Sequence, residues 1–141
     1  MLDRLAHTID VNLSTSISKD IDSIDVAKMS KGSVLTVHSS LTSTTTSAEV
    51  DCRGYNSILV QVTQTGTGTW TYSIQGSLIS GATFFDCYEQ TNTGSMMQMS
   101  YSGVTSSRMF LFKGIPDYIK VVATETVDGA TVSVQVQPLN M

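Results

Sequence analysis

The alternation of apolar and polar residues, which runs through most of the chain after residue 33, constrains the fold more than any other feature. In the final stretch, "ATVSVQVQPL", valines at 132, 134 and 136 are separated by serine and glutamine. Successive side chains of a β-strand point to opposite faces of a sheet, so a period of two predicts strands with one buried face. The stretches "YNSILVQVTQ" (55–64) and "TWTYSIQGS" (69–77) follow the same pattern.

Further strand candidates are separated by short breaks rich in glycine, serine and threonine. They cover residues 33–40, 48–52, 82–89, 95–102, 108–114 and 117–126. The polar, β-branched stretch "TSTTTS" (42–47) fits an exposed loop or an edge strand, and the sequence leaves both open. Eight or nine short strands without a helix predict an all-β domain, an antiparallel β-sandwich of jelly-roll or immunoglobulin-like topology.

Two turns that contain glycine predict β-hairpins. "TGTG" (65–68) joins the strands at 55–64 and 69–77, and Asp128-Gly129 joins the last two strands. Glycine accepts the positive φ that tight hairpin turns require. We therefore expect the two strands on either side of each turn to be neighbours in one sheet.

The first 31 residues follow no single period, and we interpret them as an N-terminal arm, partly helical or extended, ahead of a β-sandwich domain over 32–141. A segment that cannot bury all its apolar residues against itself needs another surface. That surface is either the β domain of the same chain or a neighbouring subunit, and the hinge-like "SKGS" (30–33) favours the neighbour. The predicted partner contacts of the arm are Leu5, Ile9, Val11, Leu13, Ile17, Ile21 and Ile24.

The composition excludes several classes of partner. Charged residues make up only 14% of the chain, against about 25% in a typical globular domain, and the net charge is −4. Without a basic patch, we expect no nucleic-acid partner. No apolar run approaches the roughly 20 residues of a membrane helix, so we expect no membrane partner. The N-terminus lacks the pattern of a signal peptide, and we expect the chain to fold in a cytoplasm.

The cysteines and histidines do not form a metal-binding pattern. Cys52 and Cys87 are too few for a zinc site by themselves, and His7 and His38 lack ligand spacing to either of them. We interpret both cysteines as buried free thiols. No metal or other cofactor is predicted.

The carboxylates and serines predict no catalytic residue either. Glu49 with Asp51, and Asp86 with Glu89, are pairs of acidic residues, but neither resembles the oxygen-rich "DxDxDG" loop of a calcium site. We interpret them as solvated charges. The chain contains no GxSxG nucleophile motif and no phosphate-binding glycine loop. An enzyme is therefore not expected.

Trp70 and Tyr72 pose a choice between a stacking platform for a ligand and a place in the core. They share a strand face with Ile74, and the opposite face carries only threonine, serine and glutamine. One face of a sandwich strand must be apolar, and burial of a large aromatic side chain contributes roughly 2–3 kcal/mol. We therefore interpret both residues as core.

The stretch "TFFDCYEQTNTG" (83–94) is the predicted ligand or partner loop. Phe84, Phe85 and Tyr88 cannot all point inward from one strand, because neighbouring side chains alternate. At least one should be exposed or covered by another chain; the alternative is a corner between sheets that is buried on both sides. The methionines of "MMQM" (96–99) suit either an adaptable binding surface or a gap in the core.

The β region between Val50 and Leu139 resembles small structural proteins of tailed bacteriophages, especially head decoration proteins. "GTWTYSIQGS" (68–77) is similar to a strand motif of the form aromatic-x-aromatic-x-x-x-Gly-Ser, and "IKVVATETVDGATVSVQV" (119–136) is similar to the final hairpin of such proteins. The arm matches no motif of the family, and no functional residue carries over by position.

The resemblance implies a non-enzymatic virion protein that is made in the host cytoplasm and acts as a decoration (cement) protein on the capsid surface. Its implied partners are the major capsid protein and further copies of itself, as a homotrimer. Two alternatives remain: a carbohydrate- or receptor-binding module of a head or tail fibre, and a ring component of the neck or tail.

Overall fold

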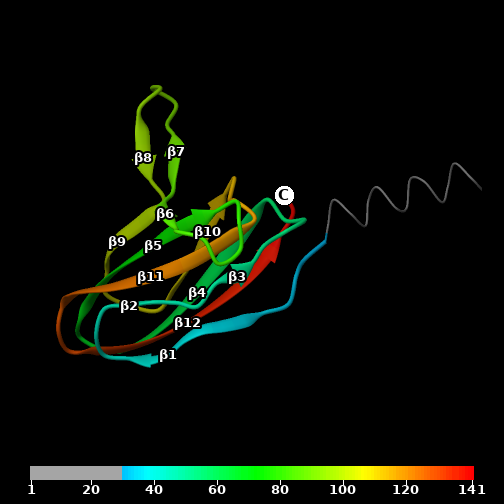
Figure 1. Cartoon of the computed structure of the whole chain (residues 1–141). Helices are drawn as coiled ribbons and strands as arrows, with labels where there is room; N and C mark the ends of the chain where they lie inside the picture. The colour runs from blue at the N-terminus through cyan, green and yellow to red at the C-terminus, as the bar shows by residue number, and fades with distance from the viewer. Residues whose placement is uncertain (1–29) are drawn as a thin grey trace, which may run out of the picture. The chain divides into compact units, whose positions relative to one another are not determined.

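The structure, a computed structural model, describes residues 30–141 as a set of β-strands without a helix (Figure 1). The all-β prediction is therefore confirmed, and no segment of residues 30–141 forms a helix that could cross a membrane. The predicted arm contacts all lie outside the described residues. The strands are β1 (Leu35–Leu41), β2 (Thr45–Thr46), β3 (Val50–Asp51), β4 (Ser57–Gly66), β5 (Thr69–Ser77), β6 (Phe85–Asp86), β7 (Tyr88–Gln90), β8 (Met96–Gln98), β9 (Ser100–Val104), β10 (Arg108–Lys113), β11 (Tyr118–Val127) and β12 (Ala130–Leu139).

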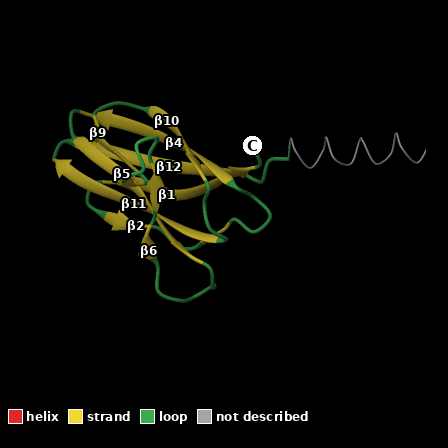
Figure 2. Cartoon of the chain, turned by 90° about the horizontal axis from the view of Figure 1, so that it is seen from above, coloured by secondary structure: helices red, strands yellow, loops and turns green. Residues whose placement is uncertain are grey.

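The strands build an antiparallel β-sandwich, as predicted (Figure 2). One sheet has the order β1-β12-β4-β10, and the other has the order β2-β11-β5-β6, with β3 also paired to β11 and β9 also paired to β5. The structure contains more strands than the predicted eight or nine. The stretches 82–89 and 95–102, each predicted as one strand, are split into β6 with β7 and β8 with β9. The polar stretch 42–47 supplies β2, a short edge strand.

The core lies between the two sheets and takes the apolar face of each long strand. Trp70 and Tyr72 are fully buried, so their interpretation as core residues is confirmed. Their rings stack with centroids 6.5 Å apart, and the ring of Phe110 from the opposite sheet lies 6.1 Å from Tyr72. Other buried side chains of the core are Ile58, Val60, Val62, Ile74, Ile119, Val121, Val132, Val134 and Val136.

Neither of the two predicted hairpins forms. β4 and β5 belong to different sheets, and so do β11 and β12. β4 pairs with β12 along its whole length and β5 pairs with β11, so both turns carry the chain from one sheet to the other. The physical reason is burial: each of these strands has one apolar face, and a crossover places the two faces on opposite sides of the same core.

The two crossovers meet at one end of the sandwich, and their glycines allow the two backbones to approach each other very closely. Gly66, with φ +91°, pairs with Ala130, and Thr67 N–H donates a hydrogen bond of 3.0 Å to the carbonyl oxygen of Gly129. A Cβ on Gly66 would collide with this carbonyl oxygen, and a Cβ on Gly68 would lie 2.7 Å from the backbone of Val127 and Ala130. The glycines that suggested hairpins are thus required for a crossing.

This crowding predicts unequal effects for two matched substitutions. Gly54 also has a positive φ (+83°), but no atom lies within 4 Å of the position of a Cβ there. We expect Gly54→Ala to lower the free energy of unfolding by about 1 kcal/mol through backbone strain. Gly66→Ala should lower it by roughly 1–3 kcal/mol more, because the crossover must also move apart. Urea denaturation measures both values, and equal losses would contradict the crowded crossover.

Candidate functional site

Six large apolar side chains are exposed on the β5–β6 loop, on β6 and on the β7–β8 hairpin. Leu78, in the loop after β5, is 78% exposed, and Phe85, in β6, is 69% exposed. Large exposed apolar patches are uncommon on soluble monomers and mark surfaces that bind partners or ligands. We call five of them the apolar patch: Leu78, Ile79, Phe85, Tyr88 and Met96. The sixth, Met97, lies on the opposite face of the hairpin.

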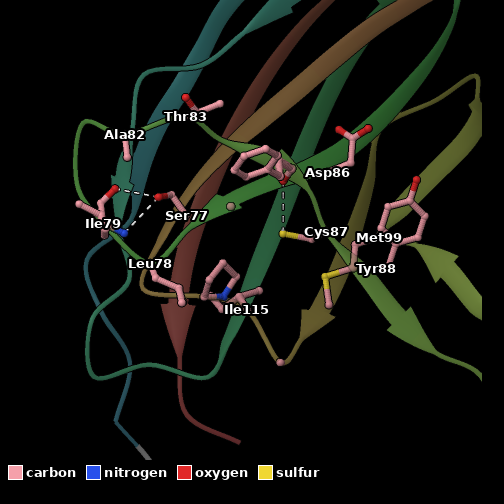
Figure 3. A pocket seen from close by; sticks show the side chains of 14 residues that line it. Ser77, Leu78, Ile79, Ala82, Thr83, Asp86, Cys87, Tyr88, Met99 and Ile115 are labelled. Atoms are coloured by element: carbon pink, nitrogen blue, oxygen red, sulfur yellow. Dashed lines mark hydrogen bonds between the residues drawn. The ribbon is translucent and has the colours of Figure 1, made fainter.

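Four residues of the patch line a groove of about 740 Å³ (Figure 3). Its walls come from residues 76–88 and from the turn Gly114–Pro116 that follows β10. The thiol of Cys87 lies between Leu78 on one side and Tyr88 on the other (Figure 3). Buried Gly76 lets the groove close beneath them, since a Cβ there would collide with Pro116 and lie 2.8 Å from Cys87 Sγ.

The loop that carries Leu78 and Ile79 is held by one carboxylate, that of Glu49, which lies directly before β3. Ser80 Oγ donates a hydrogen bond of 2.6 Å to Glu49 Oε1, and the Gly81 N–H donates one of 2.9 Å to Glu49 Oε2. The serine hydrogen bond, followed by the backbone one, lowers the pKa of Glu49 below its ordinary value. Glu49 lies at the surface, but its role as an anchor of the groove wall is not visible in the sequence.

The β7–β8 hairpin interrupts the edge strand that pairs with β5. β6 pairs with one half of β5 and β9 with the other, and residues 88–98 leave the sheet between them. At the junction, Cys87 N–H donates to Ile74 O at 3.0 Å, Ile74 N–H donates to Met99 O at 3.0 Å, and Met99 N–H donates to Cys87 O at 2.8 Å. The hairpin is therefore an insertion that projects from a sheet edge already closed beneath it (Figure 1).

This hairpin carries apolar side chains on both of its faces. Gln90 pairs with Met96 and Tyr88 with Gln98, so Tyr88 and Met96 share a face, while Met97 lies opposite Glu89 on the other. Among residues 30–141, β7 and β8 pair with no third strand, and two-stranded hairpins are only marginally stable in water. A partner that covers one face would supply the missing burial.

The predicted ligand loop separates into residues that face the groove and one that does not. Phe85 and Tyr88 are exposed, so the alternative of a corner buried on both sides is wrong. Phe84 does not line the groove; Lys120 Nζ lies 4.5 Å from its ring centroid. A ligand or partner role for these residues stays a prediction. Sequence reasoning missed Leu78 and Ile79, although two adjacent large apolar residues beside a Ser-Gly pair are a detectable sign of an exposed loop.

The methionines of "MMQM" divide between the surface and the core, and a binding role for the exposed ones stays a prediction. Met96 and Met97 lie on the surface in β8, whereas Met99 is buried in the core. The boundary between the two roles is the junction of hairpin and sheet, which the sequence pattern does not mark.

The two cysteines and His38 of the described region are buried to different degrees. Cys52 is fully buried, as predicted, but Cys87 is only partly buried; both are free thiols. Burial raises the pKa of Cys52 to about 12, and burial followed by the charge of Asp86 raises the pKa of Cys87. His38 is buried with Nε2 2.9 Å from Val121 O. Within residues 30–141, no group of three or more His, Cys, Asp or Glu residues could hold a metal ion.

Asp51 and Asp86, from the two predicted acidic pairs, contact neighbouring polar side chains at the surface. Asp51 forms an ion pair with Arg53 at 2.7 Å. Asp86 accepts a hydrogen bond of 3.1 Å from Gln75 Nε2 across the β5–β6 pairing.

Comparisons with known proteins show the fold. No protein-family profile and no curated protein sequence matches the chain. The crystal structure of the SPBc2 prophage-derived protein YomS is similar with a TM-score of 0.51 and 14% identity, over 77% of this chain and 94% of that one. The PBSX exported protein XepA is similar with a TM-score of 0.50 and 19% identity, over 78% of this chain but only 38% of its own length. The predicted resemblance to phage proteins is thus confirmed at the level of the fold.

If Glu49 anchors the groove wall, its titration should be detectable at the residues that it holds. Because the folded state lowers the pKa of Glu49, its anchoring contribution is complete above the ordinary carboxyl pKa of about 4.3 and is lost as the pH falls through the lower, folded value. The Gly81 amide proton should follow this titration in NMR spectra, with a midpoint below about 4.3. Glu49→Gln should abolish it, and Glu89→Gln in the hairpin should leave it unchanged. A midpoint at or above the ordinary value would contradict the anchor.

Proposed function

We propose that this chain is a non-enzymatic structural protein of a tailed-bacteriophage particle and that it decorates the outer surface of the head by binding the major capsid protein. The observation that carries the proposal is the apolar patch, which stands open to solvent on a small sandwich of low charge. Such a surface suits protein contact, and its cost in exposed apolar area is repaid when a partner covers it.

The phage origin rests on the fold shared with a prophage-derived protein. The likeness to YomS extends over 94% of that chain, so a sandwich of this kind makes up nearly all of the crystallised YomS chain. This fits a small protein that adds to an assembly rather than building it. The sequence motifs that resemble head decoration proteins, around Trp70 and in the last two strands, support the finer assignment.

The energetics of the patch suit attachment in many copies. Each large apolar side chain contributes roughly 1.5–3 kcal/mol when fully buried. Association must first offset several kcal/mol of lost translational and rotational entropy. A contact of this size binds moderately by itself. On a capsid, where copies sit side by side at repeated positions, linkage between copies raises the effective affinity. Self-association as a trimer at symmetry axes provides such a linkage.

The arm and the hairpin can be tested separately on purified heads of the phage that encodes the chain. We expect deletion of residues 1–31 to abolish head binding, because the arm carries the apolar contacts predicted from its sequence, while circular dichroism still shows a folded β domain. Full occupancy of heads by the truncated chain would show that the arm is not required.

Removal of the β7–β8 hairpin tests the other half of the proposal, and it should leave the sandwich folded because the strands at the base of the hairpin are already hydrogen-bonded to each other. Replacing residues 88–98 by Gly-Gly should keep the β5 edge intact, since Cys87 and Met99 are joined by a hydrogen bond of 2.8 Å. We expect this variant to keep the cooperative unfolding of the wild type and to bind heads more weakly. Quantitative mass spectrometry of particles gives the copy number, and a number that matches one ring would assign the chain to the neck or tail instead.

A second candidate function, carbohydrate or receptor binding, is favoured by one observation. Phe85 and Tyr88 are aromatic, exposed and border the groove, as residues that stack on sugar rings do. In that case Tyr88→Ala should remove binding to a glycan array without loss of folding, whereas Val127→Ala, at an exposed site at the other end of the sandwich, should retain it. An array without any signal for the wild type would count against this candidate.

A further inference from the structure

We propose that the groove binds the apolar stretch Ile9–Leu13 from the arm of a second copy of this chain. The inference concerns self-association and does not depend on the proposed role on a phage head. It assigns an occupant to the groove and a partner to one part of the arm. It leaves Met96 and Met97 of the hairpin, which do not line the groove, and Ile17, Ile21 and Ile24 of the arm for contacts with the capsid.

The groove has the size and chemistry of a site for an extended apolar segment. Its volume of about 740 Å³ falls within the roughly 300–1,000 Å³ of sites that enclose a drug-sized ligand, which is enough for several side chains. Leu78, Ile79 and Ile115 line one side, and Tyr88 with Met99 lines the other. The only carboxylate among the lining residues is Asp86, which is already paired with Gln75.

The arm contains one stretch with the matching pattern. In "IDVNL" (9–13), Ile9, Val11 and Leu13 alternate with Asp10 and Asn12. An extended segment of this kind presents its three apolar side chains to one surface and its polar side chains to water. The apolar face fits the groove, and the opposite face keeps Asp10 away from Asp86.

Lys31, the residue at which the described β domain begins to pair, lies at the same end of the sandwich as the groove. Lys31 forms a bridge with Leu139, and the Gly32 N–H donates a hydrogen bond of 2.7 Å to Pro138 O. The groove wall Gly114–Pro116 lies at this end as well, because β12 and β10 both pair with Ser57 of β4 there. A second copy that packs against this end would bring its groove close to Lys31.

The length of chain before Lys31 is sufficient to reach a neighbour. The 17 residues 14–30 separate the apolar stretch from Lys31. Fully extended, they span at most roughly 55–60 Å. A domain of this size has a radius of gyration of about 13 Å, so two sandwiches side by side fall well within this reach.

A disulfide trap in the full chain tests the inference. Cys87 lines the groove and is partly accessible, whereas Cys52 is fully buried and serves as an internal control. With Val11→Cys, the introduced thiol should form a disulfide with Cys87 of a second copy when diamide is added; the two thiols lose two protons and two electrons, which reduce diamide to its hydrazine. We expect covalent dimers and larger species on a non-reducing gel, with the crosslinked peptides identified by mass spectrometry.

Two matched variants define the background of this trap. Asn12→Cys places the thiol on the other face of the same stretch, and Val127→Cys places it on an exposed position at the far end of the sandwich. Both should crosslink several-fold less than Val11→Cys. Equal yields from Val11→Cys and Val127→Cys would show random collision and overturn the inference. A disulfide within one chain would overturn it as well, because the groove would then hold its own arm.

Thiol reactivity provides a second readout that needs no introduced cysteine. In the wild type, Cys87 should react with a thiol reagent several-fold more slowly in a concentrated sample than in a dilute one, because association covers the groove. Leu13→Asp should remove this dependence on concentration, whereas Val127→Asp should keep it. A rate that is independent of concentration in the wild type would overturn the inference. A chain that shows the dependence but does not bind heads would retain this inference and lose the proposed function.

Discussion

The rest of the structure depends on the shared burial of four long strands between two sheets. β4 with β12 and β5 with β11 each pair along their whole length, and the apolar faces of both pairs meet in one core around Trp70 and Tyr72. Since burial of one large apolar side chain contributes roughly 1.5–3 kcal/mol, this core outweighs any local preference of the turns. The glycines in the turns at one end are a consequence of this arrangement. Both turns cross from one sheet to the other there, and their backbones lie in direct contact.

The two ends of the sandwich differ in how completely they are closed. At the crossover end, the backbone of Gly66 and Gly129 is packed so tightly that no Cβ fits at Gly66. At the other end, the β5–β6 loop and the Gly114–Pro116 turn stand apart and leave a groove whose apolar walls no part of residues 30–141 covers. A single carboxylate, Glu49, holds one of those walls in place. The closed end is tightly packed, and the open end is where we place the proposed recognition surface.

The β7–β8 hairpin shows how such a surface is added without disturbing the core. Because Cys87 and Met99 are joined by a hydrogen bond at its base, the sheet edge is complete beneath the insertion. Met96 and Met97 are exposed, and methionine side chains are flexible enough to fit an uneven surface. Phe85 and Tyr88 are exposed aromatic residues, a type that is common among the anchors of protein interfaces. The combination is typical of a binding surface. The fold is shared with prophage-derived proteins, and the patch is where we place the function proposed for this one.

The sequence by itself determined the strands, their buried faces and the two central aromatic residues, because alternation is a local property that every strand carries in its own residues. It also predicted that at least one of Phe84, Phe85 and Tyr88 would be exposed, since neighbouring side chains of a strand point to opposite faces. Only the tertiary structure decided which strands pair. A glycine turn such as 65–68 is locally the same in a hairpin and in a crossover, and the choice depends on residues more than 60 positions away along the chain. The groove and its anchor at Glu49 were likewise decided by the tertiary structure, since they form only where segments that are distant in the sequence come together.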